Sequence, residues 1–159
     1  PREGAAARAS GTTLRFAAVA GAREYAVAIE DEGGERVLAV QTAATTVEVP
    51  AGILRPSASY FWRFRPLGDS HLYPSTEAYF VTLSDADAAS FSELERRSRA
   101  GAEPSMTALR IGLAAGLGLW WEACEALQES AGALPSHDLT ELGQRLSCQL
   151  LTAAPPATP

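Results

Sequence analysis

The sequence predicts a two-part α+β protein, an antiparallel β-sandwich followed by a small bundle of about four α-helices. Over residues 1–84, short segments with alternating apolar and polar residues are separated by Gly, Pro and Asp turns, which is typical of half-buried strands. From residue 85 onward, apolar residues recur every three or four positions, which is the period of a helix. We therefore expect a sandwich over 1–84, a helical domain over 85–152 and a Pro-rich tail over 153–159.

Seven short runs in the first part carry the strand signal, and each ends at a turn. We expect strands over residues 5–9, 13–19, 25–30, 37–42, 45–49, 59–66 and 77–83. The first of these is the weakest, and a flexible lead-in is the alternative. A hairpin turn is expected at the Asp-Glu-Gly-Gly run over 31–34, because glycine reaches positive φ without strain.

The sixth strand is a run of alternating aromatic residues. Tyr60, Trp62 and Phe64 alternate with Phe61 and Arg63, which predicts one buried face and one solvated face covered by arginine stems. A binding face on the arginine side is the alternative. Three large aromatics on one face, with Trp62 at the centre, would anchor most of a small core.

Leu54, Pro56 and Tyr60 stand as Leu-x-Pro-x-x-x-Tyr at the start of this strand. The spacing resembles the tyrosine corner of fibronectin type III and other immunoglobulin-like sandwiches, in which a Tyr hydroxyl folds back onto upstream backbone. Phe16 in the second strand and Tyr25 in a Gly-Ala-x-x-Tyr motif add to the resemblance, although Trp is commoner at the position of Phe16. The likeness is closest to bacterial envelope versions, and it implies structural roles for these five residues.

The period changes at Ser84, where a capping hydroxyl precedes Asp85 and Asp87 and predicts a helix start. We expect helices over residues 85–100 and 106–117, a third helix that begins at Trp120 or Trp121 and ends at Ala131, and a fourth over 139–150. The fourth repeats leucine at three- and four-residue intervals, which gives it a clear apolar stripe.

A Gly-x-Trp-x-Glu-Ala motif begins at Gly118 and is followed by Leu127 and Pro135. It resembles the second half of a tetratricopeptide repeat, in which Gly ends one helix, Ala allows close helix packing and Pro closes the unit. The preceding helix departs from that pattern, since Thr107 and Arg110 occupy places that usually hold Trp and Leu. The resemblance implies a degenerate helical unit of a protein-binding family.

Charge and motif content exclude several classes of function. The net charge is −6 and Lys is absent, which is a poor match for phosphate backbones, so we expect no nucleic-acid partner. The sequence contains no stretch of 18 consecutive apolar residues, so we expect no membrane span. His71 and His137 lack zinc-ligand spacing, and no phosphate-binding loop or nucleophile motif is present. We therefore expect no metal, no cofactor and no catalytic residues, and hence no enzyme.

Two pairs of residues in the helical part are candidate sites. Cys124 and Cys148 lie on neighbouring predicted helices, and they either form a disulfide in an oxidising compartment or remain as buried thiols. Trp120 and Trp121 are adjacent, so both cannot easily face one core. Either both pack internally, or one is exposed and contacts a partner.

The two resemblances together imply a non-enzymatic structural or protein–protein interaction module of a bacterial secreted or cell-envelope protein. We expect a protein partner, including copies of the chain itself, and self-assembly into an oligomer or filament. Residues 1–9 are a candidate strand for addition to a neighbour's sheet edge. The alternative is a sensor or regulatory soluble region of a larger membrane-anchored protein, since the chain begins at Pro1 rather than Met.

Overall fold

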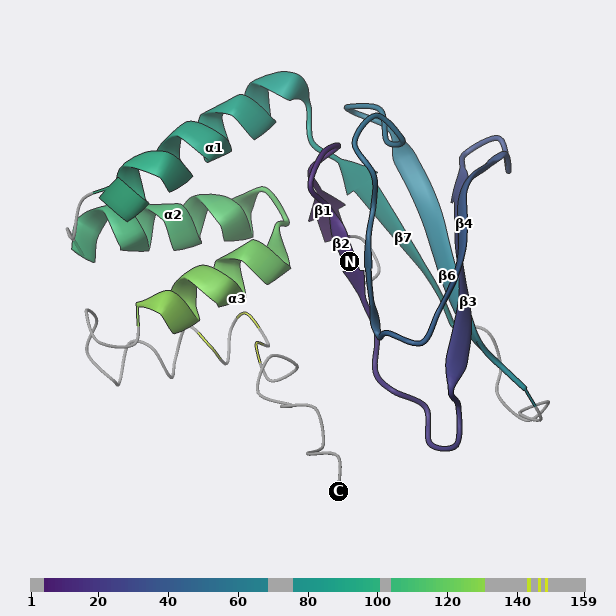
Figure 1. Ribbon diagram of the computed structural model, residues 1–159. Coiled ribbons are helices and arrows are strands. Elements are labelled where there is room, and N and C mark those ends of the chain that lie inside the picture. Colours follow the sequence, from purple (N-terminus) through teal and green to yellow (C-terminus); the bar gives the residue numbers. More distant parts are fainter. Residues whose placement is uncertain are drawn as a thin grey trace. The chain divides into compact units, whose positions relative to one another are not determined.

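The computed structural model describes residues 5–68, 76–100 and 104–130, together with Gly143, Leu146 and Cys148. The chain divides into two compact units, Pro1–Ala88 and Ala89–Pro159. The class is α+β, because the described residues form a five-stranded mixed sheet, a two-stranded sheet and three helices (Figure 1).

The first unit contains seven strands. They are β1 (Ala5–Ala7), β2 (Thr13–Arg15), β3 (Glu24–Asp31), β4 (Arg36–Thr42), β5 (Thr46–Glu48), β6 (Ser59–Leu67) and β7 (Thr76–Thr82). The larger sheet has the order β1-β7-β6-β3-β4, and β2 pairs with β5 in the smaller one. The β3–β4 hairpin closes where the Asp31 carboxylate accepts hydrogen bonds from the backbone N–H groups of Gly33 and Glu35, at 2.9 and 3.0 Å.

The pairing of β1 corrects the expectation of a purely antiparallel sheet. Ala5 lies opposite Phe80 and Ala7 opposite Thr82 in a parallel register. The backbone N–H of Leu83 also donates to the carbonyl of Ala7 at 2.9 Å. A run of alanines carries no signal for direction, and β1 and β2 belong to different sheets, so no hairpin forces an antiparallel partner. Of the segment expected to add to a neighbour's edge, residues 5–7 are thus already paired within their own chain.

A single core cluster draws on both sheets. Its members are Ala7, Leu14, Tyr25, Val27, Ile29, Val47, Val49, Leu54, Tyr60, Trp62 and Phe80. Phe16 packs at its margin, stacked on Phe64 with ring centroids 4.3 Å apart and edge-on to Tyr25 at 4.9 Å. Phe16, Tyr25 and Trp62 therefore lie together, which fits the structural roles that the sequence assigns to them.

The Leu-x-Pro-x-x-x-Tyr segment folds around the backbone of Arg55. The Tyr60 hydroxyl accepts a hydrogen bond from the Arg55 N–H at 2.8 Å. The Thr82 hydroxyl donates to the Arg55 carbonyl at 2.6 Å and accepts from the Ala58 N–H at 2.9 Å. Leu54 is buried beside this loop, and Ser57 adopts a positive φ of 52°. Both polar backbone groups of Arg55 are thus satisfied by side chains from β6 and β7.

The second unit contains α1 (Asp85–Ala100), whose first residues fall at the end of the first unit, α2 (Pro104–Gly116) and α3 (Trp120–Glu129). The Ser84 hydroxyl accepts from the Asp87 N–H at 3.1 Å, which confirms the predicted cap of the first helix. α2 begins two residues before the predicted start, and α3 ends two residues before the predicted end. The predicted fourth helix and the Pro-rich tail lie outside the described residues, apart from Gly143, Leu146 and Cys148.

Tyr60→Phe should destabilise the first unit by about 1–3 kcal/mol, because it leaves the Arg55 N–H without its partner. Urea unfolding of the two proteins measures the difference. Tyr79→Phe is the matched control, since its hydroxyl bonds the Ser59 hydroxyl at 3.1 Å in a half-exposed position. If both variants lose the same unfolding free energy, the Tyr60 hydrogen bond contributes no more to stability than the half-exposed bond of Tyr79.

Candidate interaction surface

The outer face of the five-stranded sheet presents an exposed aromatic side chain. Tyr60 and Trp62 enter the core, so the alternation of β6 turns Phe61 and Arg63 to the opposite face. Phe61 lies opposite Glu30 on β3 and opposite Tyr79 on β7. Its side chain is 39% exposed, which makes it an exposed large aromatic on a regular strand in the middle of a sheet.

Tyr79 holds the Phe61 ring in place. The two ring centroids lie 5.4 Å apart, with the planes tilted by 52°. The Tyr79 hydroxyl in turn donates to the Ser59 hydroxyl on β6 at 3.1 Å. The next residue of β7, Phe80, is fully buried, whereas Tyr79 joins the outer face.

A charged triad lies beside this aromatic pair. The Glu30 carboxylate accepts hydrogen bonds from Arg63 on β6 and from Arg36 on β4, the latter at 3.3 Å. The hydrogen bond from Arg63 holds the pKa of Glu30 below its ordinary value and outweighs desolvation, which acts the other way; Arg36 adds to the lowering. The same hydrogen bond raises the pKa of Arg63. We call Phe61, Tyr79, Glu30, Arg63 and Arg36 the sheet face.

Short side chains follow the sheet face along β3 and β4. Ala28 lies opposite both Arg63 and Ala39, and Ala26 lies opposite Arg65 and Gln41. A Cβ methyl rises little above the backbone, so the sheet surface between the longer side chains is shallow and open to an approaching chain. Aromatic and arginine side chains around such a surface are the composition that protein interfaces favour.

The helical unit presents a second set of exposed apolar side chains. Trp121 at the start of α3 is 37% exposed, whereas Trp120 is half-buried. Leu109 on α2 is 57% exposed. The structure thus places the more exposed indole at Trp121.

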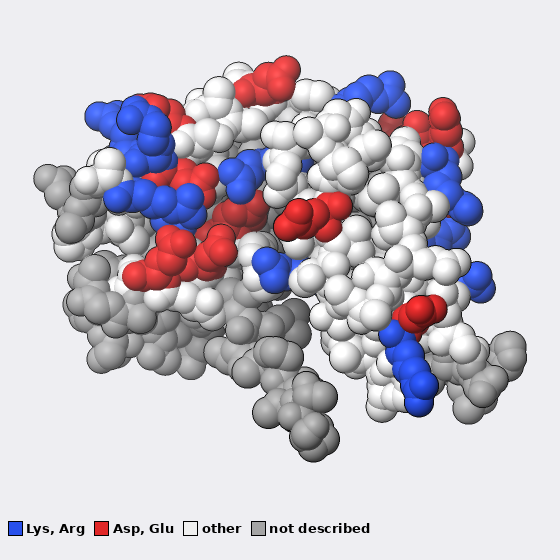
Figure 2. Space-filling model, viewed as in Figure 1, with Lys and Arg blue, Asp and Glu red and all other residues white. Residues whose placement is uncertain are grey.

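A buried arginine links the helices of this unit. Arg110 on α2 is only 3% exposed and contacts the Glu129 carboxylate on α3 at 2.8 Å. Arg99 on α1 reaches the same carboxylate at 3.6 Å and pairs with Glu95 at 3.2 Å. Figure 2 shows acidic and basic side chains intermixed over these helices. Sequence reasoning noted Arg110 only as a departure from the repeat pattern and missed this role, because its partner Glu129 lies on another helix.

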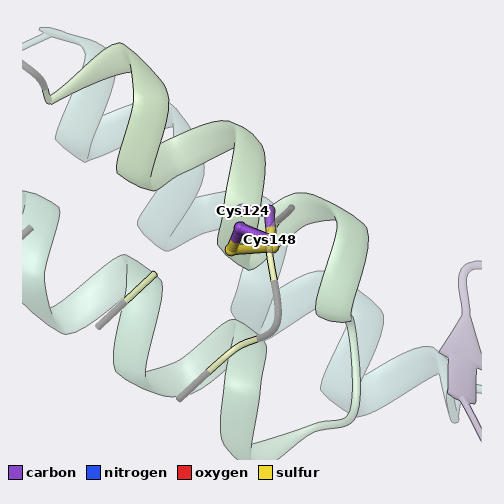
Figure 3. The surroundings of a disulfide bond; sticks show 2 residues. All are labelled: Cys124 and Cys148. Atoms are coloured by element: carbon purple, nitrogen blue, oxygen red, sulfur yellow. A yellow bond between two sulfur atoms is a disulfide. The ribbon is translucent and has the colours of Figure 1, made fainter. Parts of the chain in front are cut away.

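Cys124 and Cys148 form a disulfide in the structure (Figure 3). Cys124 is buried on α3, and the Cα atoms of the two residues lie 5.5 Å apart. Leu146, two positions before Cys148 in the sequence, is buried. A Cβ atom placed on Gly143 would lie 3.6 Å from the side chain of Leu127 on α3. Gly143 and Cys148 therefore lie against α3.

Among the described residues, no group of three or more His, Cys, Asp and Glu side chains is placed to hold a metal ion. His71 and His137 lie outside those residues. None of the described helices combines the length and apolar character that a bilayer crossing requires.

Replacing Glu30 by Gln should make the unfolding free energy depend less steeply on pH in the acid range. Because the folded pKa of Glu30 is lowered, its ion pairs stabilise the fold above the ordinary pKa of 4.5, and this contribution is lost as pH falls through the folded pKa. Unfolding free energy measured from pH 7 down to acid should fall less steeply in the variant. Glu48 is an exposed acidic residue on β5, and the Glu48→Gln variant should lose unfolding free energy in acid as steeply as the wild type. A weaker pH dependence in that control would contradict the assignment to Glu30.

Replacing both cysteines by alanine should lower the unfolding free energy of the helical unit by about 3.5 kcal/mol, the chain-entropy value for a loop of this size. The bridge spans 24 positions of sequence. Chemical denaturation followed by amide exchange in α3 measures the loss, and reduced wild-type protein should match the double variant. Alkylation of both cysteines in unreduced native protein would refute the bridge.

Comparison with known proteins adds no assignment to these surfaces. No family model matches the chain, and no curated protein matches it. The function proposed below therefore rests on the residues and geometry of the chain itself.

Proposed function

We propose that this chain is a non-enzymatic structural or protein–protein interaction module of a bacterial secreted or cell-envelope protein, and that it self-assembles into an oligomer or filament. The observation that carries the proposal is Phe61, an exposed aromatic ring held by Tyr79 and flanked by Arg63, Glu30 and Arg36 on a regular sheet. Because regular strands are stiff, such a ring loses little entropy when a partner covers it.

The first unit is proposed to be a fibronectin type III-like sandwich over residues 1–84. Two features support this: the Tyr60 hydroxyl bonds upstream backbone at Arg55, and Leu14 of the small sheet shares a core cluster with Ile29 of the large one. Modules of that architecture act mostly as spacers and protein-binding units.

The second unit is proposed to be a degenerate tetratricopeptide-like bundle over residues 85–152. Gly118 adopts a positive φ of 77° between α2 and α3, where an L side chain would be strained. Ala123 is fully buried, which allows α2 and α3 to approach closely. Its exposed Trp121 is a further candidate contact for a protein partner.

The disulfide supports the envelope or extracellular location. Structural disulfides persist in oxidising compartments such as the periplasm and the cell exterior, and they are rare in the reducing cytosol. Cys124 and Cys148 are bonded, and among the described residues there is no free thiol.

Phe61→Ser should weaken assembly, because it removes the ring that a partner would desolvate. We expect light scattering of the wild-type chain to show masses well above the 16.7 kDa of one copy, with regular particles in electron micrographs. The variant should dissociate at concentrations at least about fivefold higher than the wild type, since a central interface aromatic is worth about 1 kcal/mol or more.

Ala18→Ser is the control, because Ala18 is exposed and lies outside the sheet face and outside the helical unit. It should leave assembly unchanged. A wild-type chain that stays monomeric at every concentration would refute self-assembly, and equal effects of the two variants would refute the sheet face as the site.

A further inference from the structure

The strand β4 forms one end of the five-stranded sheet. The order β1-β7-β6-β3-β4 gives β4 one partner, β3, and no strand of the described residues lies on its other side. β4 spans Arg36–Thr42, whereas β1 at the opposite end has only Ala5–Ala7. The longer edge therefore presents a row of backbone N–H and C=O groups that a further strand could pair.

From Leu38 to Thr42, this edge lacks the devices that usually protect sheet edges. Natural sheets place charges, prolines or bulges on their edge strands. Residues 37–42 read Val-Leu-Ala-Val-Gln-Thr, with no charge and no proline. The irregularity in the pairing of β3 with β4 lies between Ile29 and Glu30, and from Leu38 to Thr42 the register is regular. A regular, uncharged segment of five residues is thus left open.

The core is also incompletely covered at β4. Val37, Leu38 and Val40 pack against the core cluster but stay half-buried. On the adjacent strand, Val27 and Ile29 are fully buried. The difference follows from position, because β3 has neighbours on both sides and β4 has one. A strand added beyond β4 would bury the remaining apolar surface of these side chains.

We infer that β4 pairs in an antiparallel direction with β4 of a second copy, across a two-fold axis at Ala39. This register sets Leu38 beside Val40 of the other copy, so that the half-buried apolar residues of the two copies cover each other. Ala39 meets its own counterpart on the outer face, where its small side chain offers no obstruction. The two sheets then continue into one sheet of ten strands.

The charges of the edge permit this pairing. Arg36 is the one charged residue of β4, and it lies at the end of the strand, where this register places it opposite Thr42 of the other copy. Its guanidinium is already paired with Glu30 of its own chain at 3.3 Å. No like charges therefore face each other across the edge, whereas most charged edges repel their own copies.

The inference rests on the proposed function and names one contact of the assembly. A two-fold edge contact uses the same surface on both copies, so it closes at a dimer. Growth beyond the dimer needs a different contact, which the proposal assigns to Phe61 and its neighbours. The two contacts are centred on different strands, Phe61 on β6 and Ala39 on β4, so they can be removed one at a time.

The test uses Ala39→Lys and Ala39→Glu in the full chain. Each variant alone places like charges opposite each other at the two-fold axis, and its dimer dissociation constant should rise at least about tenfold in sedimentation experiments. Mixing the two variants should restore the dimer, because Lys then faces Glu. This recovery also shows that both variants are folded. Ala17→Lys, at an exposed alanine outside β4, is the control and should dimerise like the wild type.

Undiminished association of Ala39→Lys, or no recovery on mixing, would overturn the edge contact. The same experiments in a Phe61→Ser background separate the two proposals. If Phe61→Ser stops assembly at dimers and Ala39→Lys then yields monomers, both contacts stand. Dissociation by Phe61→Ser with no effect of Ala39→Lys overturns the edge contact alone, whereas the reverse pattern overturns the sheet face alone.

Discussion

The fold of the first unit depends on the satisfaction of one loop residue's backbone. Arg55 lies between the core residue Leu54 and the strand β6, where an unpaired N–H or C=O would cost about 1–3 kcal/mol. The Tyr60 hydroxyl accepts a hydrogen bond from the Arg55 N–H, and the Thr82 hydroxyl donates one to the Arg55 carbonyl. Side chains of β6 and β7 thus bind the same peptide segment. This attachment fixes where β6 begins, and hence which of its side chains face the core.

The alternation of side chains along β6 then decides which of them face the core and which face solvent. With Tyr60 fixed inward, Trp62 must follow it into the core, and Phe61 and Arg63 must face outward. The register with β7 brings Phe61 to Tyr79, and the register with β3 brings Arg63 within reach of Glu30. The sheet face is therefore a direct consequence of the same hydrogen bonds that stabilise the interior.

Local signals in the sequence predicted most element positions. The capping residue Ser84 marks the start of α1, and basic residues in the last turn of the helix mark its end. The alternation of apolar and polar residues marks β3 and β6. The direction of β1 was predicted wrongly, because three alanines carry no information about their partner. The meeting of Phe61 with Tyr79 and the burial of Arg110 against Glu129 were also not predictable, since each depends on residues that the fold brings together from separate elements.

The parallel pairing of β1 with β7 has a mechanical consequence. The chain enters the first unit at one end of this pair and leaves it at the other, because the two strands run in the same direction. Tension applied through the flanking chain would therefore slide the strands lengthwise and load their hydrogen bonds together, rather than peel them apart one by one. A unit built in this way resists stretching along its chain axis better than one whose end strands separate one hydrogen bond at a time.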